Sequence, residues 1–181
     1  MNEMKDMELQ ELSGIRFPPE KLSLRKLGNF LYHEGPLLSH LINEKNEDFL
    51  MLWCDVDKTY NRWLLSKTNY FLLNQYFQEN VTLRDLIISN PDGFVYFVDI
   101  DNNIDWKRAF IVPIESIDDD YLPGEGSGFA ETGFEPYAHQ LKSYLEYHFA
   151  RKQKLYAPAT VPEIALVMDL PSDAEYGKTK K

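Results

Sequence analysis

Short stretches of hydrophobic residues, either alternating with polar residues or running together for five or six positions, are separated by polar turns along most of the chain. Both patterns are typical of β-strands, because successive side chains of a strand point to opposite faces of its sheet. In 49–54 both sets of alternating positions are apolar, which predicts a strand in the interior of a sheet. The expected strands are 27–32, 37–42, 49–55, 60–66, 94–99, 106–112 and 164–168.

Hydrophobic spacing of about 3.6 residues, rather than 2, predicts helices in three other stretches. The first is 67–78. Thr82 is a suitable N-cap for a short second helix, and the carboxylate of Asp85 favours the same helix N-terminus. Residues 134–154 keep the helical spacing longest and end in basic side chains, which suit the negative end of the helix dipole.

Two segments between these elements have the composition of turns or loops. Asn and Asp dominate 99–105, and because both tolerate left-handed backbone and bond their own chain, they predict a hairpin between the flanking strands. Residues 117–133 contain several glycines and few large side chains, so we expect a mobile loop. A lid, or a segment ordered by a partner, is the functional alternative for this loop.

These elements predict one α+β domain over 27–170, in which the two longer helices pack on a mostly antiparallel sheet of five to seven strands. Residues 1–26 carry charges and the pair Pro18 and Pro19, which interrupts a helix, so we expect a partly flexible N-terminal arm. Residues 171–181 are expected to be a flexible tail.

Composition indicates an acidic globular protein. Of the 181 residues, 44% are hydrophobic and 14% aromatic, enough to bury a sizeable core. The 19 Lys and Arg against 29 Asp and Glu give a net charge of −10, which disfavours direct binding to nucleic-acid phosphates or to an anionic membrane. No apolar run approaches the roughly 20 residues of a membrane span, no secretion signal is visible, and the single Cys54 cannot form an intramolecular disulfide. We therefore expect a cytoplasmic protein.

None of the sequence motifs associated with catalysis or metal binding is complete. The segments that start at Asp55 and Asp99 begin like calcium-binding loops, but both lack the glycine and the final glutamate that such a loop needs. The four histidines lack a metal-binding spacing, and the glycines of 124–128 lack the Lys and the Ser or Thr of a phosphate-binding loop. We therefore expect no catalytic residue, metal or cofactor.

Aromatic residues are abundant, and tyrosines with a solvent-exposed hydroxyl are typical of interface cores. Arg62 is positioned either to bind a ligand or to form a structural ion pair with Asp55 or Asp57 across a hairpin turn, and we favour the ion pair. The candidate residues for binding a partner or ligand are Tyr60, Arg62, Trp63, Tyr121, Phe129 and Tyr137.

Four short motifs lie between residues 30 and 123. They are Trp53-x-Asp55-x-Asp57-x-x-Tyr60-x-Arg62-Trp63-Leu64, Thr82-Leu83-Arg84-Asp85-Leu86-Ile87, Asp92-Gly93-Phe94-Val95-Tyr96, and Val112-Pro113 with Asp120-Tyr121-Leu122-Pro123. Together they resemble a family of small uncharacterised bacterial proteins, a domain of unknown function. The resemblance implies a bacterial or phage-like cytosolic setting, and it carries no assigned activity.

The negative charge, the aromatic residues and the lack of a catalytic set favour a non-enzymatic protein-interaction module with an acidic, tyrosine-rich surface. Its partner would be a basic protein, and immunity, antitoxin and defence-associated components are modules of this kind. The alternative is a small-molecule-binding or enzymatic domain with a pocket under 117–133. The polar residues near such a pocket would be Asp118, Asp119, Asp120, Glu125 and His139. A nucleic-acid mimic is a third hypothesis, against which the mixture of both charge signs counts.

Overall fold

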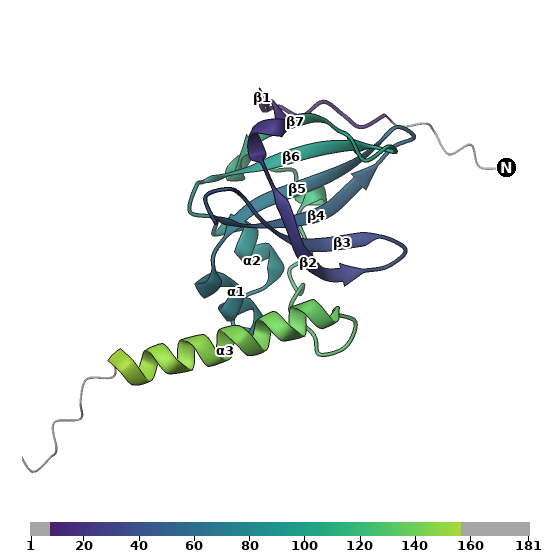
Figure 1. Ribbon diagram of the computed structural model, residues 1–181. Helices are drawn as coiled ribbons and strands as arrows, with labels where there is room; N and C mark the ends of the chain where they lie inside the picture. The colour runs from purple at the N-terminus through teal and green to yellow at the C-terminus, as the bar shows by residue number, and fades with distance from the viewer. Residues whose placement is uncertain (1–7, 157–181) are drawn as a thin grey trace, which may run out of the picture. The chain divides into compact units, whose positions relative to one another are not determined.

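The structure, a computed structural model, describes residues 8–156, and contacts within the chain divide it into two units, Met1–Leu145 and Glu146–Lys181. The first unit holds a seven-stranded antiparallel sheet with helices packed on it, which confirms the predicted α+β class (Figure 1). Of the second unit the structure describes residues 146–156, the last part of helix α3 (Pro136–Tyr156). The strand expected at 164–168 and the tail expected at 171–181 lie outside the described residues.

All neighbouring strands of the sheet are antiparallel, and their order is β1-β7-β6-β5-β4-β3-β2. The six strands predicted within the described residues are all present, and β1 is an addition to them. The strands are β1 (Ile15–Phe17), β2 (Arg25–Tyr32), β3 (Pro36–Ile42), β4 (Asp48–Val56), β5 (Tyr60–Thr68), β6 (Phe94–Asp101) and β7 (Trp106–Pro113). As predicted, β4 is an interior strand: Leu50 and Met51, which point to opposite faces, are both buried.

The segment before residue 27, predicted as an arm, contributes to both edges of the sheet. β1 pairs with β7 at one edge, and after the 3-10 turn η1 (Pro19–Leu22) the chain continues as β2, which pairs with β3 at the other edge. The connection crosses one face of the sheet (Figure 1), and Leu22 is buried there in a cluster with Leu65 and Val98. Phe17 and Leu24, which flank the crossing, pack against the same cluster, so the crossing is part of the core of this face, the crossed face.

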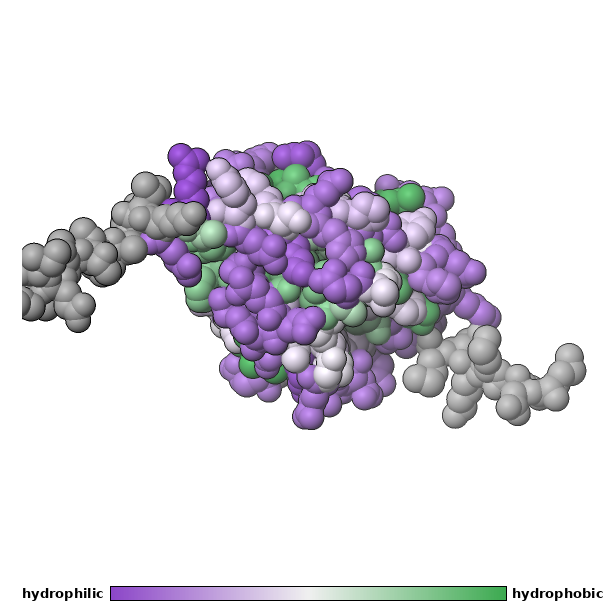
Figure 2. Space-filling model, turned by 90° about the horizontal axis from the view of Figure 1, so that it is seen from below, coloured by the Kyte–Doolittle hydropathy of each residue, from purple (hydrophilic) through white to green (hydrophobic). Residues whose placement is uncertain are grey.

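Helices cover the opposite face of the sheet, the helix face (Figure 1). They are α1 (Tyr70–Phe77), α2 (Leu83–Ile88) and, within the first unit, the part of α3 up to Leu145. The ring of Phe77 on α1 lies 5.4 Å from that of Phe30 on β2, and Ala138 and Leu145 of α3 are fully buried. Seen from the helix side, the surface is mostly hydrophilic, with hydrophobic residues scattered over it (Figure 2).

The predicted start of α2 agrees with the structure, whereas the predicted start of α1 does not. The Thr82 hydroxyl accepts a hydrogen bond from the Asp85 amide, and the Asp85 carboxylate accepts one from the Thr82 amide, so α2 begins with a complete capping box. Helix α1 begins at Tyr70 rather than at 67, because β5 continues to Thr68 and the Asn69 side chain then caps the helix.

The predicted hairpin at 99–105 joins β6 to β7, but its left-handed residue is not an Asn or Asp. The Asp101 carboxylate accepts two backbone amides of the turn, and Ile104 has φ 68°. In the hairpin between β3 and β4, Asn43 caps the turn in the same way and the left-handed residue is Asn46, with φ 59°. Isoleucine, branched at Cβ, is strained in this region of backbone space, whereas asparagine tolerates it.

Replacing Ile104 by Asn is therefore expected to raise the free energy of unfolding by about 1 kcal/mol, because it relieves this backbone strain. The isoleucine side chain is 80% exposed, so its removal gives up little buried area. Urea unfolding followed by circular dichroism measures the change. Ile15→Asn, at an exposed position of β1 outside any left-handed turn, is the control and should not stabilise the protein. An Ile104→Asn variant no more stable than the parent would contradict the explanation.

Candidate functional site

Arg62 on β5 is completely buried and forms the centre of a polar cluster on the helix face of the sheet. Its guanidinium donates two hydrogen bonds to the Asp99 carboxylate, at 2.8 and 2.9 Å, and Nε of Arg108 donates to the same carboxylate at 2.5 Å. The remaining nitrogen of Arg62 donates to the backbone oxygen of Gln10 at 2.8 Å and to the Tyr121 hydroxyl at 3.1 Å. The cluster therefore ties the sheet to the N-terminal segment and to the start of the 117–133 loop.

The prediction that Arg62 pairs with Asp55 or Asp57 is wrong. Asp99 lies directly opposite Arg62 in the regular pairing of β5 with β6. Asp55 is the corresponding neighbour on β4, but a register shift separates it from Trp53 and its carboxylate bonds to a backbone amide beside it. The Asp57 carboxylate accepts amides of its own hairpin turn and the amide of the buried Leu9. The regular strand pair thus supplies the partner of the buried charge.

The surroundings of Arg62, Cys54 and Tyr121 shift the pKa values of these three groups. Burial by itself would lower the pKa of Arg62, but the hydrogen bonds and charge of Asp99 raise it above its ordinary value. Burial raises the pKa of the neighbouring Cys54 to about 12, and its thiol donates to the backbone oxygen of Arg62. Burial also raises the pKa of Tyr121, although the charge of Arg62 opposes this. None of these three groups changes its charge near neutral pH.

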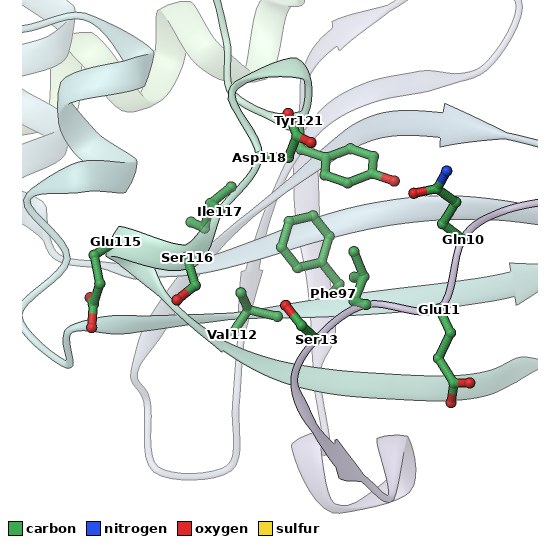
Figure 3. A pocket seen from close by; sticks show the side chains of 11 residues that line it. Gln10, Glu11, Ser13, Phe97, Val112, Glu115, Ser116, Ile117, Asp118 and Tyr121 are labelled. Carbon is green, nitrogen blue, oxygen red and sulfur yellow. The ribbon is translucent and has the colours of Figure 1, made fainter.

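Two cavities border the cluster, one of about 350 Å³ and one of about 400 Å³. Both are lined by Gln10, Asp118 and Tyr121, so they are neighbours along the N-terminal segment. Figure 3 shows the first cavity: Gln10 and Glu11 of that segment lie on one side, Glu115 and Asp118 on the other, and the sheet lies between them. The carboxylates that line the two cavities are Glu8, Glu11, Asp55, Glu115, Asp118 and Asp120.

These carboxylates are little neutralised. Glu11 pairs with the exposed Arg16 at 2.9 Å, and the Asp118 side chain caps the backbone amide of Asp120. Among residues 8–156, no salt bridge joins a cation to the side chain of Asp118 or Asp120. The two cavities are therefore an acidic surface that suits positively charged side chains.

The 117–133 loop is anchored, which differs from the expected mobile loop or lid. Phe129 is only 4% exposed, and its ring lies 5.2 Å from that of Phe77 on α1. The backbone oxygen of Ser127 accepts the Leu83 amide of α2, and Arg84 donates to the backbone oxygen of Pro123. One large apolar side chain among the glycines provides the packing that holds the loop.

The part of this loop that borders the two cavities is 117–121. Asp118 and Asp120 line them. Asp119, Glu125 and His139 line neither cavity; Asp119 forms an ion pair with Arg84, and His139 lies 3.8 Å from Glu131. The polar residues grouped by the hypothesis of a pocket under this loop therefore do not converge.

Of the predicted binding residues, Tyr60, Arg62 and Tyr121 belong to one cluster. Tyr121 accepts a hydrogen bond from Arg62, and the Tyr60 ring lies 4.6 Å from the guanidinium of Arg108, which shares the Asp99 carboxylate with Arg62. Trp63 is on the crossed face, and Phe129 belongs to the core. Sequence reasoning missed Asp99 and Arg108. Each is a charged residue on the otherwise apolar face of its strand, and the two strands, β6 and β7, form a hairpin. This pattern could have identified the pair.

Tyr137 is separate from the Arg62 cluster. Its hydroxyl lies 2.8 Å from Nδ1 of the fully buried His40, and Nε2 of His40 lies 2.7 Å from the Asp48 carboxylate. Burial raises the pKa of Tyr137 to about 12. This chain of hydrogen bonds joins β3, β4 and the first turn of α3, and no sequence pattern indicated it. Its partners are mutually satisfied, so we assign it a structural role.

Within residues 8–156 no group of three or more His, Cys, Asp or Glu side chains could hold a metal ion. The third residues of the calcium-like segments, Asp57 and Asp101, are the caps of hairpin turns: the carboxylate of each accepts two backbone amides of its turn. Among the helices that the structure describes, none combines the length and apolar character needed to cross a membrane. Comparisons of the chain with protein-family models, curated proteins and solved structures find no match.

Proposed function

We propose that the protein is a non-enzymatic protein-interaction module whose acidic surface around Tyr121 binds a basic segment of a partner protein. The observation that carries the proposal is the set of six carboxylates around two neighbouring cavities. Their negative side chains are suited to pairing with the Lys or Arg side chains of such a segment. The net charge of −10 would also speed the encounter with a basic partner.

The state of the titratable groups near the cavities supports a binding role rather than catalysis. A general acid or base works best with a pKa near the operating pH, and a nucleophile must be activated by a neighbouring base. Arg62 and Asp99 are already bonded to each other, and the Cys54 thiol has a pKa of about 12. Tyr121 has its pKa raised rather than lowered. The cluster serves as a rigid support for the acidic surface.

The biological setting that we propose is a bacterial cytosolic one, in which the module acts as an immunity, antitoxin or defence-associated component. This part of the proposal rests on the motif resemblance over about residues 30–123 and on the acidic charge, since a basic toxin or nuclease is a natural partner for such a surface.

The double variant Asp118→Asn with Asp120→Asn tests the site, because it removes two charges while the asparagine at 118 keeps an acceptor for the Asp120 amide. With a fluorescent oligolysine peptide as the probe, we expect its affinity to fall about tenfold, or about 1.4 kcal/mol, in a fluorescence anisotropy titration at low salt.

The matched control is Glu20→Gln with Glu44→Gln, which removes the same charge from exposed positions outside both cavities. It should change the affinity less than twofold. Equal losses in the two double variants would mean that binding follows net charge alone, and a parent protein that does not bind the peptide would contradict the proposed class of partner.

A further inference from the structure

All three tryptophans of the chain lie on the crossed face of the sheet, away from the acidic cavities. Trp53 and Trp63 face each other on the adjacent strands β4 and β5, and Trp106 at the start of β7 packs against the same cluster as Trp63. Trp63 and Trp106 line a groove of about 480 Å³. Its other apolar lining residues are Leu24, Pro36, Leu41, Met51, Ile100 and Ile104.

The curl of the sheet forms this groove. Leu24, which precedes β2, and Lys26 of β2 contribute to its lining, as do Ile104 in the turn before β7 and Trp106 at the start of β7. In strand order β2 is at one edge of the sheet and β7 is next to the opposite edge, with four strands between them. Side chains from the strands in between, Met51 among them, form the floor. An apolar groove of this volume is within the range of small-molecule sites.

Ile104 lies in a strained turn beside the groove, which indicates that its apolar side chain has a function there. The residue is 80% exposed and held at φ 68°, while Asn46 occupies the same position of the equivalent hairpin without strain. An exposed isoleucine there contributes little to the core. It does extend the apolar wall of the groove beyond Trp106.

The polar groups of the groove include several donors without an acceptor among the described residues. These donors are the ammonium of Lys26, the side-chain amide nitrogen of Asn61, whose oxygen accepts from Trp53, and the indole N–H groups of Trp63 and Trp106. The one lining carboxylate, Asp101, already accepts two turn amides and lies 3.3 Å from Lys107. A bound molecule that complements these groups has an acceptor or negative charge beside an apolar body.

We propose that this groove is a binding site for a small amphipathic carboxylate, whose apolar body lies against Trp63, Trp106 and Ile104 and whose carboxylate pairs with Lys26. The chain as a whole is negative, but screening limits such long-range repulsion to about 8 Å at physiological ionic strength. The groups in contact with the ligand therefore decide whether a negatively charged ligand binds. The site is on the other face of the sheet from the acidic cavities, so this proposal does not depend on the protein-interaction function.

Titration of the full chain with octanoate tests the proposal, with tryptophan fluorescence and calorimetry as readouts. Saturable binding is expected, with an affinity about tenfold higher than that of 1-octanol, which has the same chain without the charge. Lys26→Gln should remove this preference while leaving the octanol affinity unchanged. Lys45→Gln, which loses the same charge on an exposed turn outside the groove, is the control and should bind octanoate like the parent.

Ile104→Asn adds a variant that does not depend on charge. It should weaken both ligands about fivefold, although the fold remains at least as stable as in the parent. The proposal is overturned if octanoate does not bind saturably, if octanol binds equally well, or if Lys26→Gln and Lys45→Gln have equal effects. It is also overturned if light scattering shows a dimer that excludes octanoate, because a second copy of the chain would then be the occupant of the groove.

Discussion

Asp99→Asn is expected to lower the free energy of unfolding by about 3 to 5 kcal/mol, the largest effect of any single substitution considered for this protein. The substitution leaves the guanidinium of Arg62, which is fully buried, without its counter-charge, and it removes the charge partner of Arg108 as well. Asparagine can still accept a hydrogen bond but cannot neutralise either arginine. Urea unfolding followed by circular dichroism measures the loss.

Asp105→Asn is the matched control for this experiment. It removes a carboxylate from the same hairpin, but that carboxylate is 64% exposed and pairs with the partly exposed Lys107, so the expected change is within about 0.5 kcal/mol. A double variant, Arg62→Met with Asp99→Leu, should lose less stability than Asp99→Asn alone, because the fully buried guanidinium is removed together with its counter-charge and only the partly exposed Arg108 loses its partner. A loss below about 1 kcal/mol for Asp99→Asn would contradict the view of Asp99 as the essential counter-charge.

Gly28→Ala is expected to cost about 2 kcal/mol or more, because β2 and α3 approach each other closely at this glycine. A Cβ atom there would lie 2.3 Å from Cγ of the Tyr137 ring, which is the fixed end of that side chain. Moving the ring would also disturb its hydrogen bond to His40. The same unfolding experiment measures the cost, and loss of the near-ultraviolet circular dichroism signal would accompany it.

Gly35→Ala is the control, since nothing lies within 4 Å of a Cβ added at that turn. In a Tyr137→Ala background the Gly28→Ala penalty should largely disappear, because the atoms that the new methyl group meets are no longer present. A penalty that stays the same in that background would show that backbone conformation, rather than the tyrosine ring, requires glycine at 28.

Local sequence signals predicted the elements of the fold well, and the differences have identifiable causes. The strands and the capping box of α2 depend on neighbouring side chains, which the sequence displays directly. β1 was missed because three residues carry too little pattern to predict a strand, and only pairing with β7 defines it. In the hairpin at 99–105 the expected turn formed, but the Asp101 cap imposed the left-handed conformation on an isoleucine.

Residue type identified half of the candidate site, and spatial pairing supplied the rest. Tyr60, Arg62 and Tyr121 were recognised as candidates from their chemistry. The partner of Arg62 was assigned to the nearest carboxylates in sequence, yet the structure gives it Asp99, 37 positions away. A local pattern does not contain the register between β5 and β6, so it could not choose between carboxylates on the two neighbouring strands.

The sequence by itself determined the longer strands, the capping box of α2, the net charge of −10 and the incompleteness of the metal-binding motifs, because each depends on residue type and short spacing. Only the tertiary structure decided which side chains meet. The curl of the sheet brings β2 near β7 around the tryptophan groove, the N-terminal segment crosses to both edges, and Phe129 anchors the glycine-rich loop. These features depend on contacts between residues far apart in the chain, whose geometry is fixed by strand pairing and core packing.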